Sequence, residues 1–151
     1  MLDDTDRRLL RHLQADPAQP MTQLALAVGV PLATCYKRLD RLQAQGVLRG
    51  QHVTIDWAAL GYAVEVSLRI TLDKTDPRAF DVFLAAARDV PEVTEIQTFL
   101  GRVDVRLAVI ARSMTHYQRI YRERILSLPH IADIEALMQV ATIKNQQTVP
   151  L

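Results

Sequence analysis

A strict alternation of apolar and polar residues, from Val64 to Leu72, constrains the fold of this chain more than any other stretch. Its apolar members are Val64, Val66, Leu68, Ile70 and Leu72. A period of two predicts a β-strand with one face in a core and the other in water. Residues 1–55 instead follow the spacing of amphipathic helices. The change of period predicts two domains, 1–55 and 63–151, joined by a linker at 56–62.

A helix and two strands should follow this first strand. Asp76 and then Pro77 predict an N-cap with proline at the first helical position, and the helix should stop before Pro91. Its predicted inward residues are Phe80, Phe83, Leu84 and Ala87. Residues 93–100 and 103–111 have the composition of strands, and a tight turn at Gly101-Arg102 should join them.

A second helix and a last strand complete the pattern. Ser113 can cap the helix, which should end at Leu128-Pro129. Its predicted inner side carries Tyr117, Ile120, Tyr121 and Ile125. The last strand is predicted over roughly 131–140. The order β-α-β-β-α-β predicts an α+β, ferredoxin-like domain, an antiparallel sheet with both helices on one face. The other face would be wet or would pair with a second copy of the chain.

Three helices are predicted before the linker. Asp3 can cap the first, which carries leucines on one side and should end by Asp16-Pro17. The other two lie within 21–45 and are joined by a turn at Gly29, with Thr22 as a possible N-cap. The last helix has an apolar stripe of Cys35, Leu39 and Leu42, and its other side carries Thr34, Lys37, Arg38 and Arg41. This is a helix-turn-helix pattern with a basic second helix, suited to a DNA major groove.

The segment that follows, 47–55, is rich in β-forming residues and predicts a short hairpin or wing, from which Arg49 could reach a phosphate. The formal net charge of the chain is only +1, so any case for DNA rests on local charge. Cys35 is the single cysteine, which excludes an intramolecular disulfide. No apolar run approaches membrane-spanning length, and the acidic start is unlike a signal peptide, so we expect a cytoplasmic protein without a membrane partner.

No metal, cofactor or catalytic group is expected. The four histidines, His12, His52, His116 and His130, are far apart and lack the spacing of metal ligands. No cluster combines a nucleophile with an adjacent base. The sequence therefore predicts a protein that is not an enzyme.

Several motifs occur in one order along the chain: LDDTDRRLLRHLQ, then LALAVGVPLATCYKRLDRLQAQGVLRG, DWAALG, GRVD and SLPHI. In this order the chain resembles the Lrp/AsnC family of bacterial and archaeal transcription regulators, over nearly its whole length. The resemblance implies a winged helix-turn-helix domain that binds double-stranded DNA, followed by a ferredoxin-like domain that senses a small-molecule effector. It also implies homodimers, often assembled into octamers, with an amino acid bound between dimers near the G-x-x-D turn.

The resemblance assigns residues to DNA binding. Arg38 matches the characteristic arginine of the family's recognition helix and could bind a phosphate or a guanine edge. Pro31 replaces the serine N-cap usual in the family, which leaves the exact start of this helix open. The residues predicted to contact DNA are Thr22, Pro31, Ala33, Thr34, Tyr36, Lys37, Arg38, Arg41 and Arg49.

Gly101 and Asp104 match the G-x-x-D positions, with two interpretations: a tight turn whose aspartate bonds to backbone, or a clamp for an effector's amino and carboxylate groups. Relatives that bind amino acids often carry hydroxyl residues where this chain has Ile134 and Ala136. We therefore expect an apolar or aromatic amino acid, or weak binding. His130 replaces a glycine usual in the family. The predicted effector residues are Thr98, Leu100, Gly101, Arg102, Val103, Asp104, Ile134 and Ala136.

Two other functions share parts of this pattern. An architectural protein could wrap DNA with little specificity and no effector, although the near-neutral charge argues against it. Siroheme decarboxylases have a similar two-part plan, so fold alone does not exclude catalysis. The stretch that would carry their histidine is VTEIQTFLGRVDVRLAVIA in this chain and contains none.

Overall fold

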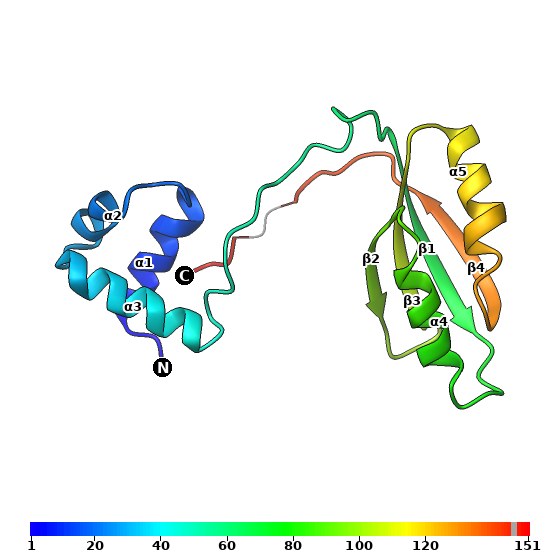
Figure 1. Cartoon of the computed structure of the whole chain (residues 1–151), viewed down its shortest axis with the longest axis horizontal. Helices are drawn as coiled ribbons and strands as arrows, with labels where there is room; N and C mark the ends of the chain where they lie inside the picture. The colour runs from blue at the N-terminus through cyan, green and yellow to red at the C-terminus, as the bar shows by residue number, and fades with distance from the viewer. Residues whose placement is uncertain (146–147) are drawn as a thin grey trace. The chain divides into compact units, whose positions relative to one another are not determined.

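A computed structural model of the protein describes residues 1–145 and 148–151, which divide into two units. The first unit comprises residues 1–54 with the described residues of 144–151, and the second comprises residues 55–143. Figure 1 shows helices in the first unit and a sheet with helices in the second. The C-terminal segment thus groups with the helices, whereas the sequence prediction placed it in the second domain.

Helix α1, Asp4–Ala15, begins as the sequence predicts, with Asp3 as its N-cap. The Asp3 carboxylate accepts a hydrogen bond from the Asp6 N–H at 2.8 Å, and the Asp6 carboxylate accepts one from the Asp3 N–H at 3.1 Å. This reciprocal capping box satisfies two N–H groups that a helix start leaves without partners. It also holds two carboxylates side by side at the start of α1.

Helices α2, Met21–Val28, and α3, Leu32–Ala44, form the predicted helix-turn-helix. Gly29 makes the turn with a φ of 75°, a left-handed conformation that glycine adopts without strain. The apolar faces of the three helices meet in a small core of Leu9, Leu24, Ala25, Val28 and Cys35. The burial of Cys35 raises the pKa of its thiol, as expected of a packing residue.

Both helices of the motif begin differently from the prediction. Thr22 lies inside the first turn of α2 and is exposed, so its predicted role as N-cap is wrong; Pro20 occupies that position without a side-chain bond. Pro31 is the N-cap of α3, also without a side-chain bond. Proline suits both places because its fixed φ leads into the first helical turn.

The predicted wing is wrong, because residues 45–63 contain no strand. Val53 and Ile55 are exposed, although their side chains favour strands. β-propensity is mostly a matter of packing against a neighbouring strand, and this segment has none in the described part of the chain. Residues 57–61 form a compact turn, in which the Asp56 carboxylate accepts a hydrogen bond from the Ala58 N–H at 2.9 Å.

In the second unit, residues 55–143, the antiparallel strand order is β2-β3-β1-β4. The elements are β1 Val64–Leu72, α4 Ala79–Arg88, β2 Val93–Thr98, β3 Val105–Ala111, α5 Met114–Ile120 and β4 Ile131–Met138. Helix α5 continues as a π-helical turn at Tyr121–Ile125, which the sequence did not predict. Leu68 in the central strand β1 lies opposite Leu107 and Ala136. The predicted ferredoxin-like order is confirmed.

Both helices pack on the same face of the sheet. Leu68 and Ile70 of β1 share one buried cluster with Phe83 of α4 and Ile120 of α5. Glu65, Ser67, Arg69 and Thr71 alternate with these residues and therefore lie on the face that carries no helix. We call this second face the open sheet face.

Four predicted boundaries are wrong; one is the end of the helix after Ser113, predicted at Leu128-Pro129 and observed at Ile125. Helix α4 starts at Ala79, because the Asp76 carboxylate caps a turn before it, at 2.8 Å from the Arg78 N–H, so Pro77 is not its first residue. The connection between β2 and β3 is the longer segment 99–104, closed by a bond from the Phe99 N–H to the Asp104 carbonyl at 2.9 Å. Strand β4 ends at Met138 instead of 140.

His130 has a φ of 62°. This left-handed conformation favours glycine, because a side chain there crowds the backbone. Its carbonyl accepts a hydrogen bond from the Asp73 N–H at 2.7 Å, which ties the turn before β4 to the end of β1. The replacement of glycine by His130 leaves the glycine-type turn in place.

Candidate DNA-binding and effector sites

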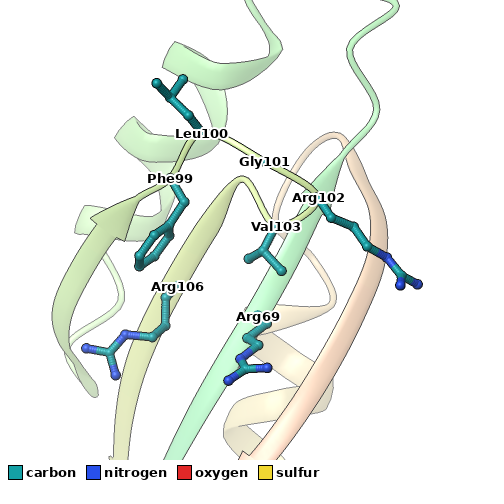
Figure 2. Close-up of a pocket in the computed structure, with 7 residues that line it drawn as sticks. All are labelled: Arg69, Phe99, Leu100, Gly101, Arg102, Val103 and Arg106. Carbon is teal, nitrogen blue, oxygen red and sulfur yellow. The ribbon is translucent and has the colours of Figure 1, made fainter.

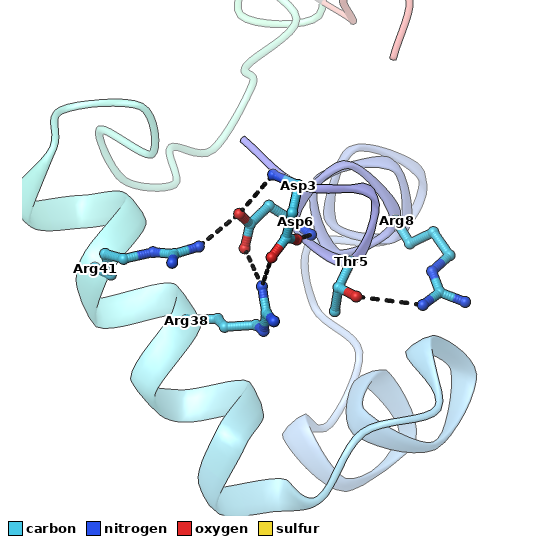
Figure 3. A network of polar contacts seen from close by, with 6 residues as sticks. All are labelled: Asp3, Thr5, Asp6, Arg8, Arg38 and Arg41. Carbon is cyan, nitrogen blue, oxygen red and sulfur yellow. Dashed lines mark hydrogen bonds and ion pairs between the residues drawn. The ribbon is translucent and has the colours of Figure 1, made fainter. Parts of the chain in front are cut away.

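Two arginines of the predicted DNA-binding set point from α3 toward α1 (Figure 3). The Arg38 guanidinium donates to the carboxylates of Asp6 at 2.9 Å and Asp3 at 2.6 Å. The Arg41 guanidinium donates to the second oxygen of Asp6 at 2.5 Å. The Asp6 side chain is fully buried, and both its oxygens have guanidinium partners. We call these four side chains the α1–α3 clasp.

The clasp changes the acid–base properties of its members. Hydrogen bonds from the Arg38 guanidinium and from the Asp6 N–H lower the pKa of Asp3 to about 2. The hydrogen bonds that the Arg38 guanidinium donates to the carboxylates of Asp3 and Asp6 raise the pKa of Arg38. Arg38 was predicted on the exposed side of the helix, but its side chain is only 24% exposed. The placement was wrong because a helical wheel does not show that α1 covers this side of α3.

The exposed face of α3 carries other residues. Ala33, Tyr36 and Lys37 are exposed, whereas Thr34 is half-buried. Leu32, at the first position of the helix, is also exposed and was missed by the sequence prediction, which expected apolar residues inside. The remaining predicted residues lie at the surface of the first unit: Thr22, Pro31, Arg41 and Arg49.

Asp104 is buried, and backbone and lysine partners surround it. One carboxylate oxygen accepts a hydrogen bond from the Leu72 N–H at 2.9 Å, and the other lies 2.6 Å from the Lys74 ammonium. Burial would raise the pKa of Asp104, but the ion pair and the Leu72 bond outweigh it and the pKa is lowered. The partners are Leu72, the last residue of β1, and Lys74 just beyond it, instead of the local backbone that the structural-turn interpretation expected.

A pocket of about 390 Å³ lies beside this turn (Figure 2). Its lining is Arg69, Phe99, Leu100, Gly101, Arg102, Val103 and Arg106. Phe99 and Val103 point along the open sheet face toward Arg106 and Arg69, whereas Leu100 and Arg102 point away. Arg106 is already bonded to Glu95 at 2.6 Å and to Gln97 at 2.9 Å. We call this surface the turn pocket.

The other predicted effector residues lie on the opposite face of the sheet. Thr98 pairs with the buried Val105, and Ile134 pairs with the buried Ile70. Ala136 lies opposite Leu68. Directly opposite residues share a face, so these three point to the helix side. One chain therefore brings residues 100–103 together at the turn pocket, but not Thr98, Ile134 and Ala136.

The described residues show neither a metal-ligand cluster nor a membrane-spanning helix. No group of three or more histidine, cysteine, aspartate or glutamate side chains is close enough to hold a metal ion there. None of the helices in residues 1–145 and 148–151 is long and apolar enough to cross a membrane.

The helix-turn-helix unit followed by a βαββαβ domain is the two-part plan that the sequence resemblance implied, and family comparisons decide which class of protein carries it here. Residues 2–43 match the AsnC-type helix-turn-helix domain, and residues 65–149 match the Lrp/AsnC ligand binding domain. The chain belongs to the Lrp/AsnC family of transcriptional regulators.

Individual relatives agree with this family over the full length. The proline dehydrogenase transcriptional activator of Rhodobacter capsulatus is 28% identical, over 100% of this chain and 98% of its own. The feast or famine regulatory protein from M. tuberculosis, solved in complex with L-methionine, has a TM-score of 0.86 and 25% identity, over 99% of both chains. Escherichia coli AsnC has a TM-score of 0.90 at 23% identity, again over 99% of both, which shows a shared fold.

Proposed function

We propose that this protein regulates transcription by binding specific operator DNA through the exposed face of α3, under the control of an amino acid bound by the second unit. The observation that carries the DNA-binding part is the solvent-exposed face of α3, which begins directly after the glycine turn of an AsnC-type helix-turn-helix. The L-methionine in the M. tuberculosis relative supports an amino acid as effector. The protein would act in the cytoplasm and would catalyse no reaction.

Self-association belongs to the same proposal. A single recognition helix contacts only a few base pairs, so specific binding needs a second copy. The open sheet face gives two chains a surface on which to pair into a dimer, and dimers would assemble into an octamer. The operator would then be pseudo-palindromic, with half-sites separated by about 34–36 Å or a multiple of it. Sedimentation of the full-length protein measures the assembly directly.

The effector site is proposed at the turn pocket. Phe99 and Val103 give it an apolar surface, which supports an apolar or aromatic amino acid. The sequence predicts the same class of ligand because Ile134 and Ala136 stand where relatives often carry hydroxyl residues. These two side chains lie on the helix side of the sheet, however, so they no longer support that prediction. Calorimetry against the twenty amino acids tests the class: tight binding of a small polar one such as serine would contradict it. Phe99→Ala should weaken the binding of the preferred ligand.

Lys37 provides the test of the DNA surface. It is exposed on α3 and has no acidic partner among the described ion pairs. Lys37→Ala should lower operator affinity by about 1–2 kcal/mol, the size of one lost phosphate or base contact, in an anisotropy titration at constant salt. Arg119→Ala removes a cation that is also exposed, from α5 in the second unit, and should leave affinity unchanged. Equal affinity for operator and scrambled DNA would contradict specific binding.

A further inference from the structure

The α1–α3 clasp limits what two of the three cations on α3 can do. Nη1 of Arg38 is held by the fully buried Asp6, so this nitrogen could donate to a guanine edge only by leaving that carboxylate. A buried carboxylate that loses its partner is strongly destabilising. Arg41 faces the same constraint, because it donates to the other oxygen of Asp6. The bonds to Asp6 therefore direct both arginines toward α1 and occupy one guanidinium nitrogen of each, which limits how far either can reach toward a base while α3 keeps its position.

In the first two turns of α3, most of the exposed side chains are apolar in their bulk, with Lys37 as the charged one; Asp40 and Gln43 are exposed further along the helix. Leu32 is 39% exposed and Tyr36 is 48% exposed, and both lie beside the exposed Ala33. Leu32 and Tyr36 are four residues apart, so they are neighbours on one side of the helix. Leu32 and Ala33 present no hydrogen-bond donors to a base, and Tyr36 has only its terminal hydroxyl, so contact by these side chains is mainly apolar. The apolar feature of the major groove is the C5-methyl group of thymine.

We infer that α3 recognises its operator by apolar contact of Leu32, Ala33 and Tyr36 with thymine methyl groups, while Asp6 holds Arg38 and Arg41 as positioning residues. The inference rests on the proposed function and specifies how that DNA surface selects its sequence. Leu32, Ala33 and Tyr36 occupy the first two turns of α3, the part of a recognition helix that reaches base edges. Lys37, next to Tyr36, would bind phosphate and set affinity without selecting sequence.

Thymine-to-deoxyuridine replacement tests the inference, because it removes the methyl group and nothing else. The operator would first be selected from random duplexes with the full-length protein. Each thymine of a half-site is then replaced in turn, and affinity is measured by fluorescence anisotropy at one salt concentration. We expect a loss of about fourfold at each contacted thymine, as burial of one methyl-sized apolar group implies.

Matched variants assign the contact to residues. Leu32→Ala and Tyr36→Ala should bind more weakly and should lose the difference between thymine and deoxyuridine at the position that each contacts. Lys37→Ala should weaken binding to both duplexes by the same factor and keep that difference. Arg38→Lys should also keep it. Since Leu32 and Tyr36 are exposed, we expect these variants to fold, which circular dichroism checks.

The outcomes separate the two proposals. Selection of no preferred duplex would refute sequence-specific binding itself. A preferred operator whose affinity does not change with any deoxyuridine would leave specific binding intact and overturn apolar recognition. Replacement of a half-site guanine by 7-deazaguanine gives a second test. If it lowers the affinity of the wild type but not of Arg38→Lys, Arg38 contacts that base and apolar recognition is overturned.

Discussion

Asp6 and Asp104 are the buried polar side chains of the described residues, one in each unit, with 0% and 4% of their surface exposed. Asp6 binds two guanidinium groups that belong to another helix. Asp104 binds a backbone N–H of the neighbouring strand and one exposed ammonium, that of Lys74. The first arrangement orients α3 against α1, and the second shapes the turn of residues 99–104. In each unit a buried carboxylate thus fixes the local structure beside a predicted binding surface.

The apolar surroundings of the two carboxylates differ as well. The core of the first unit is built from a few small and medium side chains on three short helices. The core of the second unit combines strand residues with Phe83, Tyr117 and Ile120 from the helices. Because fewer apolar contacts hold α3 in place, a larger share of the stability of the first unit depends on its ion pairs. Substitutions at the two carboxylates should therefore have unequal effects.

Asp6→Ala should give the largest loss. It leaves two guanidinium groups without their buried partner and breaks the capping box, so the free energy of unfolding of the first unit should fall by about 3 kcal/mol. Urea unfolding followed by far-UV circular dichroism measures it. Trp57, the single tryptophan, lies in the second unit, and its fluorescence transition should stay in place.

Asp4→Ala is the matched control for this change. Asp4 is in the same helical turn but exposed, and its loss should cost less than about 1 kcal/mol through the helix dipole. Equal effects of Asp4→Ala and Asp6→Ala would show that the clasp does not hold α3. The same variants should separate in operator affinity, because only Asp6 positions the recognition helix.

Asp104→Ala should have an intermediate effect on the second unit. The Leu72 N–H would lose its buried acceptor, which should lower the free energy of unfolding by about 2 kcal/mol, measured by Trp57 fluorescence in urea. Asp104→Asn keeps an acceptor and removes only the ion pair. Since Lys74 is 61% exposed, that change should cost at most about 1 kcal/mol, as should Lys74→Ala. A loss that appears in the helices of the first unit instead would contradict this assignment.

The stability that the clasp contributes should be lower in acid than at neutral pH. In the folded protein the pKa of Asp3 is about 2, below its ordinary value of 3.8. The unfolded chain therefore binds more protons between these values, so the stability that Asp3 contributes is present above about pH 4 and is lost as the pH falls toward 2. The difference in thermal midpoint between about pH 5 and about pH 2.5 should be smaller in Asp3→Asn, which keeps the N-cap but does not titrate. An unchanged difference would contradict the shift.

Local patterns predicted much of the fold. The bounds of β1 are those of the alternation from Val64 to Leu72, because a half-buried strand needs that period. Ser113 caps α5 as predicted, at 3.1 Å from the His116 N–H. These features depend on residues close in sequence, so their physical causes are visible in the sequence itself.

Contacts between distant residues account for what the sequence did not predict. The partners of Arg38 and Arg41 lie more than thirty residues away at the start of α1, and those of Asp104 are Leu72 at the end of β1 and Lys74 just beyond it. A helical wheel separates two faces of α3 but does not show which of them another helix covers. The missing wing has a similar cause, because strand propensity at 47–55 forms no strand without a neighbour to pair with.

His130→Gly should give the smallest change, and the change should be a gain in stability. It tests whether the backbone of the second unit is strained at a position away from Asp104. A left-handed backbone, as at His130, costs a residue with a side chain about 1–2 kcal/mol, and glycine avoids this cost. Glycine also loses more conformational entropy on folding, which reduces the gain by about 0.5–1 kcal/mol. We expect a net stabilisation of about 0.5–1 kcal/mol in the Trp57 transition, with the Asp73 N–H bond to residue 130 retained. His130→Ala keeps the strained φ and should not be stabilised. If alanine and glycine raised stability equally, the imidazole and not the backbone would be the source of the strain.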